Sequence, residues 1–100
     1  MADNLIDILQ EQTKYTGKTS KGFEFEVEAS RLDNMELVDA LADLDGGNVL
    51  VVSKLVTMML GKEQKKKLYD FYRTEKGNVP IADVSQAIVE IMSANKATKN

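Results

Sequence analysis

Residues 22–47, GFEFEVEASRLDNMELVDALADLDGG, decide the fold of this chain, because the spacing of their apolar residues changes halfway. Phe23, Phe25 and Val27 alternate with glutamates, which predicts a half-buried strand with one apolar face. Over residues 33–45 the apolar positions recur every three or four residues, which predicts an amphipathic helix that ends at a glycine pair. The N-terminal half of the chain is therefore built on a strand that leads into a helix.

A second strand is predicted immediately before this one. Residues 14–18 and 22–28 can pair as a β-hairpin, with Gly17 and Gly22 shaping its turn. Two strands alone are marginally stable in water, so the apolar face of the hairpin must lie on helices or on another subunit.

The hairpin also contains GKTS, residues 17–20, which resembles the end of a phosphate-binding loop. Such a loop needs a glycine five positions before its Gly-Lys pair and a helix directly after it. Gln12 occupies the first of these positions and a strand follows the motif, so the sequence predicts no nucleotide site.

Helices are expected after the hairpin at 33–45, capped by Asp33 or Asn34, at 49–60, capped by Asn48, at 62–76, and at 80–92 behind Pro80. Their expected inward-facing residues are Leu37, Val38, Leu41 and Leu44, then Leu68, Phe71 and Tyr72, then Ile81, Val84, Ile88, Ile91 and Met92. Residues 4–12 form a further short amphipathic pattern. The predicted fold is mainly α: a small four-helix domain, or five-helix with 4–12 included, with an N-terminal β-hairpin.

Helix 49–60 is apolar in nine of its twelve positions, and its three polar residues fall on one narrow side. A helix that is apolar over most of its circumference needs cover on several sides. Leu55, Met58 and Met59 share one side, and we expect them to contact a partner protein or another subunit rather than the domain's own core. Methionines at helical spacing also serve as core filler, but they suit surfaces that accept an imperfect or repetitive partner.

The composition indicates one soluble, globular domain of 100 residues, with a core over about 14–94 and a flexible tail at 95–100. No apolar run approaches the roughly 18 residues of a membrane span, and the acidic N-terminus does not resemble a signal peptide, so a cytoplasmic location is expected. Cysteine and histidine are both absent, which removes thiol nucleophiles, imidazole bases and the common transition-metal ligands. We therefore expect no enzymatic activity, no cofactor and no metal.

Charge is divided unevenly along the chain. Residues 1–45 contain eleven acidic and four basic residues, whereas residues 46–100 contain five acidic and nine basic ones. The acidic half can fold back on the basic half, or it can contact the basic half of another copy and build rings or open stacks. The lysines at 62 and 65–67 have acidic neighbours and no interleaved aromatic residue, which favours a solvated helix face over a nucleic-acid site. The aspartates at 39, 43 and 45 fit no EF-hand register.

Three segments together resemble the tail assembly chaperones of long-tailed, siphovirus-type bacteriophages, especially those of Gram-positive hosts. They are GFEFEVEASRLDNMELVDALADLD (22–45), VLVVSKLVTMMLGKEQKKKLYDFY (49–72) and EKGNVPIADVSQAIVEIM (75–92), with LGKEQ (60–64) as the most specific piece. The resemblance implies a non-catalytic homo-oligomer that binds the tape measure protein during tail morphogenesis and is released as tail-tube proteins polymerise. It further implies a location in the cytoplasm of the infected or lysogenic host, absence from the mature virion, and no nucleic-acid or membrane partner.

Two alternatives remain open. One is a structural phage neck or tail ring protein, whose helices would pack permanently into a ring. The other is a small host helical carrier or regulatory domain, because LDNMELVDALADL (32–44) resembles the recognition helix of acyl carrier proteins. Asn34 stands where those proteins have the serine that carries the pantetheine arm, and an amide cannot form that phosphodiester.

Overall fold

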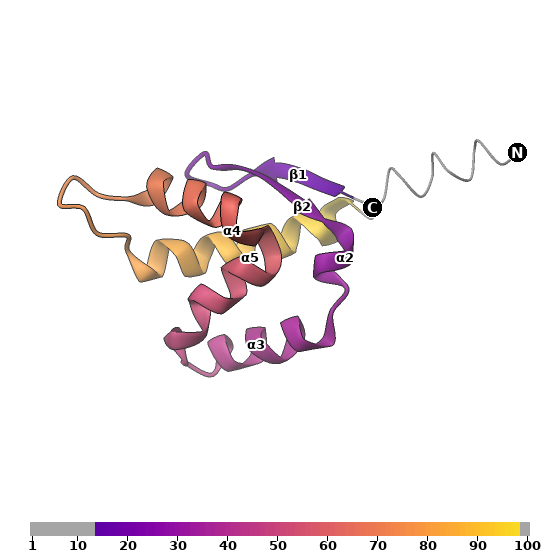
Figure 1. Ribbon diagram of the computed structural model, residues 1–100. Helices are drawn as coiled ribbons and strands as arrows, with labels where there is room; N and C mark the ends of the chain where they lie inside the picture. The colour runs from indigo at the N-terminus through magenta and orange to yellow at the C-terminus, as the bar shows by residue number, and fades with distance from the viewer. Residues whose placement is uncertain (1–13, 99–100) are drawn as a thin grey trace, which may run out of the picture.

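The computed structural model describes residues 14–98, and the side chains of residues 14–93. An antiparallel two-stranded hairpin packs against a helical layer, which confirms a small, mainly α fold with an N-terminal hairpin (Figure 1). The elements are β1 (Lys14–Lys18), β2 (Glu24–Glu28), α2 (Ala29–Leu32), α3 (Met35–Asp45), the short 3-10 helix η1 (Val49–Val51), α4 (Val52–Tyr72) and α5 (Ile81–Thr98). The helix expected at 4–12 lies outside the described residues.

The hairpin forms as predicted, with Lys14 opposite Glu28 and Lys18 opposite Glu24. The apolar side chains of its second strand are buried and the glutamates between them are exposed. Gly22 lies in the turn at a φ of 101°. The prediction for Gly17 is wrong, because Gly17 lies within β1. A Cβ atom there would be 3.0 Å from the Phe25 ring, so glycine allows that ring to lie across the strand.

Helix α3 begins where the capping signal predicts, since the Asn34 side chain accepts a hydrogen bond from the Glu36 N–H at 3.0 Å. Leu37 is buried, and the later leucines of the expected stripe are half-buried against the core. Val38 is exposed, which contradicts the prediction. It lies about 100° around the helix from Leu37, and η1 and α4 cover only one face of α3. The four-residue α2 was not predicted, because one turn is too short to show a period.

Helix α4 occupies the two stretches where the sequence predicts separate helices. Gly61 interrupts it with a non-helical φ of 81° and ψ of 171°, so two helical stretches lie on either side of a kink, as the sequence predicts. The expected start at 49 is the 3-10 turn η1, and the helix ends four residues before the predicted end at 76. Leu68 and Tyr72 are buried as predicted. Phe71 is exposed, so that prediction is wrong, although its ring lies 5.6 Å from the Phe23 ring centroid.

Helix α5 follows Pro80 and runs along α4 and β1 (Figure 1). Val84, Ile88 and Ile91 are buried, and Met92 is half-buried against the same core. Ile81 is 58% exposed, contrary to prediction, because the first turn of α5 extends beyond the part of the core that covers the rest of the stripe. The helix continues to Thr98, past the expected start of a tail at 95.

One hydrophobic core joins the hairpin, α3, α4 and α5. Its buried members are Phe23, Phe25, Val27, Leu37, Ala40, Val52, Leu55, Val56, Met59, Leu60, Leu68, Tyr72, Val84, Ala87, Ile88 and Ile91. Among the residues that the structure describes, no helix is both long and apolar enough to cross a membrane.

Candidate functional site

The three residues predicted to bind a partner lie in or against the core. Leu55 is 0% exposed and Met59 is 1% exposed, while Met58 is half-buried against core residues. The expectation that these side chains form an outer surface is therefore wrong for Leu55 and Met59. Helix α4 contacts α3, α5, α2 and β2, which together supply the cover that such an apolar helix needs.

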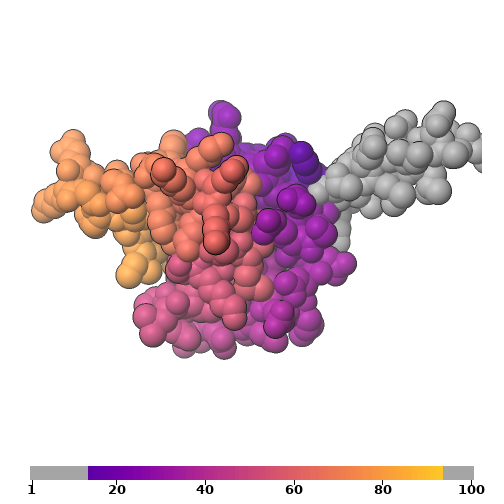
Figure 2. Space-filling view, viewed as in Figure 1, coloured from indigo at the N-terminus to yellow at the C-terminus, as the bar shows by residue number. Residues whose placement is uncertain are grey.

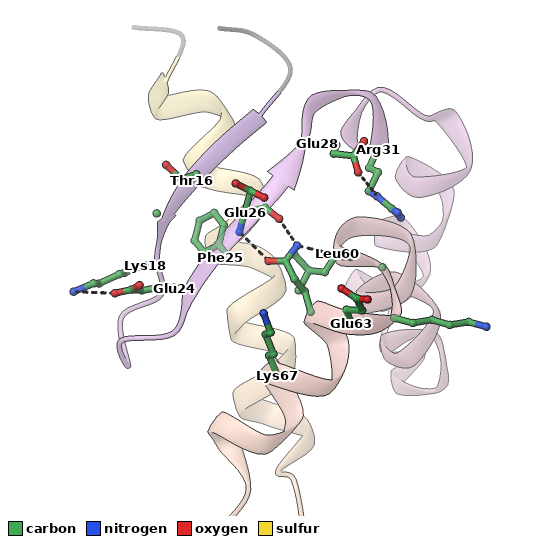
Figure 3. Close-up of a pocket in the computed structure, with 14 residues that line it drawn as sticks. Thr16, Lys18, Glu24, Phe25, Glu26, Glu28, Arg31, Leu60, Glu63 and Lys67 are labelled. Atoms are coloured by element: carbon green, nitrogen blue, oxygen red, sulfur yellow. Dashed lines mark hydrogen bonds and ion pairs between the residues drawn. The ribbon is translucent and has the colours of Figure 1, made fainter. Parts of the chain in front are cut away.

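A recess of about 830 Å³ lies between the hairpin and the bend of α4 (Figure 3). Its charged lining residues are Lys18, Arg31, Lys62 and Lys67, with Glu24, Glu26, Glu28 and Glu63. Lys18 pairs with Glu24 at 3.9 Å and Arg31 pairs with Glu28 at 3.7 Å. Equal numbers of both signs give this recess no preference for an anion or a cation.

The inner wall of this recess connects secondary-structure elements. The Gln64 side chain accepts a hydrogen bond from the Glu26 N–H at 2.9 Å and donates to the Glu26 carbonyl, so it replaces the contacts of a third strand. The Arg31 guanidinium donates to the carbonyls of Thr57 and Met58 at 3.4 Å each, in the last turn before the bend. These contacts give the LGKEQ segment a role in holding the hairpin on α4.

The GKTS stretch has a hairpin geometry, in agreement with the prediction. Gly17 and Lys18 end β1, and a tight turn rather than a helix follows. Thr19 is buried, and its hydroxyl shares a hydrogen bond of 2.7 Å with the Tyr72 hydroxyl and accepts one from the Phe23 N–H at 3.1 Å. No group of three or more acidic side chains within the described range is arranged to hold a metal ion.

A separate groove of about 400 Å³ is mainly apolar and lies between the two ends of α4 and the start of α5. Its lining residues are Val49, Leu50, Val52, Ser53, Tyr69, Arg73, Val79, Ile81 and Val84. We call this the α4 groove. Leu50 is 87% exposed and Ile81 is 58% exposed, so two large apolar side chains stand on its rim. In Figure 2 the magenta end of the molecule that carries η1 lies below the orange end that carries the α4–α5 connection.

The bend at Gly61 creates the α4 groove. It turns the second half of α4 back toward the first, so the Lys65 ammonium donates to the hydroxyls of Ser53 at 2.7 Å and Thr57 at 3.0 Å. Tyr69, one turn beyond Lys65, lines the groove together with Ser53. The first turn of α5 closes the remaining side.

Ser53 and Lys65 are the nearest approach to a catalytic pair in this groove, since some hydrolases use a serine beside a lysine. The geometry does not suit that chemistry. The contact between Lys65 Nζ and Ser53 is exposed, and Lys65 Nζ also donates to the Thr57 hydroxyl and lies 5.6 Å from the Tyr69 ring centroid. A general base would need a lone pair directed at the serine. The mainly apolar lining of the groove suits it instead to binding apolar side chains.

Sequence reasoning missed the α4 groove because Leu50 and Ile81 were assigned to apolar helix faces. One local signal could have identified them. Leu50 is the second residue after the capping Asn48, and Ile81 directly follows Pro80. A large apolar residue in the first turn of a helix can project past the end of the core.

Comparisons with protein-family models, curated protein sequences and solved structures give no match.

Proposed function

We propose that this chain is a non-catalytic assembly chaperone that binds the tape measure protein of a bacteriophage tail through the α4 groove. The observation that carries the proposal is the exposure of Leu50 on the rim of an apolar groove, with Ile81 opposite. The resemblance of residues 22–93 to tail assembly chaperones supplies the identity of the partner. The chaperone would act in the host cytoplasm and leave before the virion is complete.

The size of the groove supports this function. A volume of about 400 Å³ accommodates a few apolar side chains. A long helical partner would present such side chains at every third or fourth position along one face, which is how amphipathic helices bind grooves. Full burial of one leucine or isoleucine side chain is worth about 1.5–3 kcal/mol, so two rim residues can supply a substantial part of a micromolar affinity of about 8 kcal/mol.

A structural neck or tail ring protein is the second candidate, because exposed apolar residues outside the groove, such as Met35 and Val38 on α3, could serve permanent packing. Mass spectrometry of purified virions separates the two. A chaperone is absent from the particle, whereas a ring protein is present in fixed copy number. The carrier-domain alternative is weaker, since Asn34 serves as the helix cap of α3.

The direct test is co-purification of this chain with a co-expressed tape measure protein. Replacing Leu50 or Ile81 by serine should weaken capture by about 10- to 100-fold each, which corresponds to losing the burial of one aliphatic side chain. Because both side chains are exposed, the thermal midpoint should stay close to that of the wild type. Val89→Ser is the matched control, since Val89 is 51% exposed on α5 and does not line the groove. Capture that is unchanged by both groove variants, or weakened equally by the control, would contradict the proposal.

A further inference from the structure

The α4 groove also raises the question of what covers it when no partner is bound. Val49, Leu50 and Ile81 leave large apolar side chains open to water at one place. We infer that residues 4–12 of a second copy of this chain occupy the groove in the free protein. The inference uses the groove of the proposed function, but its test involves no partner, so the two can fail independently.

The sequence of residues 4–12 fits an apolar groove. These residues lie outside the described part of the chain, and their pattern predicts an amphipathic helix with Leu5, Ile8 and Leu9 on one side. Three apolar residues at this spacing form a short stripe of the kind that binds helix-accepting grooves. The second, independent feature of the segment is its charge: residues 1–13 contain three acidic residues and no basic one.

The groove has the complementary charge. Arg73 is the one charged residue among the described residues that line it, and the Lys65 ammonium lies on Ser53 in its wall. Arg73 also pairs with Asp70 at 3.2 Å and donates to the Gly77 carbonyl at 2.8 Å, so the Asp70 carboxylate offsets its charge. Lys65 takes part in none of the ion pairs between described residues, so it supplies the net positive charge beside the groove. A basic rim around an apolar floor favours an acidic amphipathic segment over a basic one.

The number of residues between the segment and β1 favours the groove of another copy over the groove of the same chain. Figure 1 shows β1 beginning beside the yellow C-terminal end of α5, whereas Ile81, at the other end of α5, lines the groove. Seventeen residue steps of α-helix separate these ends by about 26 Å. Ile8 lies six residues before Lys14, a separation that spans at most about 20–22 Å when fully extended. Ile8 and Leu9 therefore fall short of Ile81 in their own copy, and the groove of a neighbour remains open to them.

Such a contact joins two different surfaces of the chain. A contact of this type repeats from copy to copy and builds rings or open stacks. It would also make the segment a competitor of the partner for the groove, so partner binding would release one copy from the next.

Complementation between two defective variants tests this inference in the full chain. One variant carries Leu50→Ser and Ile81→Ser and has a defective groove with an intact segment. The other carries Leu5→Ser and Ile8→Ser and has a defective segment with an intact groove. In sedimentation velocity we expect the wild type to form oligomers and each variant alone to be a monomer. An equimolar mixture should form a heterodimer through its one intact segment–groove pair, and Val89→Ser should assemble like the wild type.

Each other outcome overturns the inference. A monomeric wild type at high concentration would show that the segment does not join copies. Two monomeric variants whose mixture stays monomeric would show that the segment and the groove do not contact each other. A segment variant that assembles like the wild type would place the interface elsewhere. Circular dichroism of each variant confirms that a loss of assembly is not a loss of folding.

Discussion

At the scale of single residues, the bend of α4 depends on a glycine and two polar side chains. Gly61 has a φ of 81° and a ψ of 171°, a region of backbone space that is essentially restricted to glycine. Arg31 donates to the carbonyls of Thr57 and Met58 in the turn before the bend, and Gln64 connects the turn after it to β2. A Cβ atom on Gly61 would lie 3.2 Å from the Arg31 guanidinium. Residues close to the bend therefore fix its geometry. The bend in turn shapes both the recess beside the hairpin and the α4 groove.

Replacing Gly61 by alanine should lower the free energy of unfolding by about 1–3 kcal/mol, the usual cost of a residue held in a disfavoured backbone region. Gly46→Ala is the control, because Gly46 has a φ of −77° and an added Cβ would make contacts of 3.5 Å. Urea denaturation of the two variants gives the comparison. Equal losses of stability would show that the conformation of Gly61 does not hold the bend.

Glu90 gives a pH dependence at the same scale. Hydrogen bonds from the Ser20 side chain and then from its backbone N–H, at 2.8 Å, hold the pKa of Glu90 below its ordinary value of 4.5. A folded-state pKa below the unfolded one contributes stability that is present above about pH 4.5 and is lost as the pH falls below it. Glu90→Gln should therefore flatten the acid side of the stability profile, and Ser20→Ala should flatten it in part. Profiles of all three proteins that coincide between pH 3 and 6 would contradict this assignment.

At the scale of elements, the position of α4 decides which of its apolar residues can meet a partner. Helix α4 packs on the hairpin, α3 and α5, and Met59 belongs to the core. The exposed apolar residues lie instead at the helix ends around the α4 groove. The apolar residues around most of the circumference of this helix correctly indicated that it needs cover on several sides. It could not indicate that the domain itself supplies the cover.

The two adjacent methionines should therefore respond differently to truncation. Met59→Ala removes a fully buried side chain and should cost about 2–5 kcal/mol of unfolding free energy. Met58→Ala should cost clearly less, because Met58 is only half-buried. Thermal and urea unfolding of the two single variants measure the difference. Equal and small costs would restore the view that both residues face outward.

At the scale of the whole molecule, no ion pair between described residues joins an acidic residue of the first half of the chain to a basic residue of the second half. Helix α3 and the residues just before it, 33–45, contain five acidic residues and no basic one. None of them takes part in the five ion pairs found between described residues, which join Lys14 to Glu26, Lys18 to Glu24, Lys21 to Asp83, Arg31 to Glu28 and Arg73 to Asp70. In Figure 1, α3 lies at the bottom of the view and the lysine-rich second half of α4 lies above it. Acidic surface therefore remains available to a basic surface of another copy.

Self-association should therefore weaken with salt and persist in part. Raising the ionic strength from about 0.01 M to about 1 M shortens the Debye length from about 30 Å to about 3 Å and screens exposed charges. Exposed pairs are worth up to about 1 kcal/mol, so the association constant should fall about two- to fivefold while the apolar groove contact remains. Sedimentation at the two salt concentrations measures this. An unchanged constant would assign the contact to apolar groups alone, and complete dissociation would assign it to charge alone.

The sequence alone determined the local elements of this protein. The alternation in 23–27 predicted a strand, the capping Asn34 predicted a helix start, and the glycines at 46 and 61 each predicted a helix end. These features are predictable because backbone geometry, capping bonds and side-chain period depend on residues a few positions apart. Only the tertiary structure decided which apolar faces are covered, since that depends on contacts such as the Thr19–Tyr72 bond across 53 positions.

The candidate site is one of the features that only the tertiary structure decided. The α4 groove joins residues near 50, 70 and 80, which become neighbours only after Gly61 bends α4 and α5 returns along it. The sequence supplied the apolar residues and the bend. The fold decided that Met59 fills the core and that Leu50 remains open to water, because burial is set by the surfaces that pack around a side chain and not by its hydrophobicity.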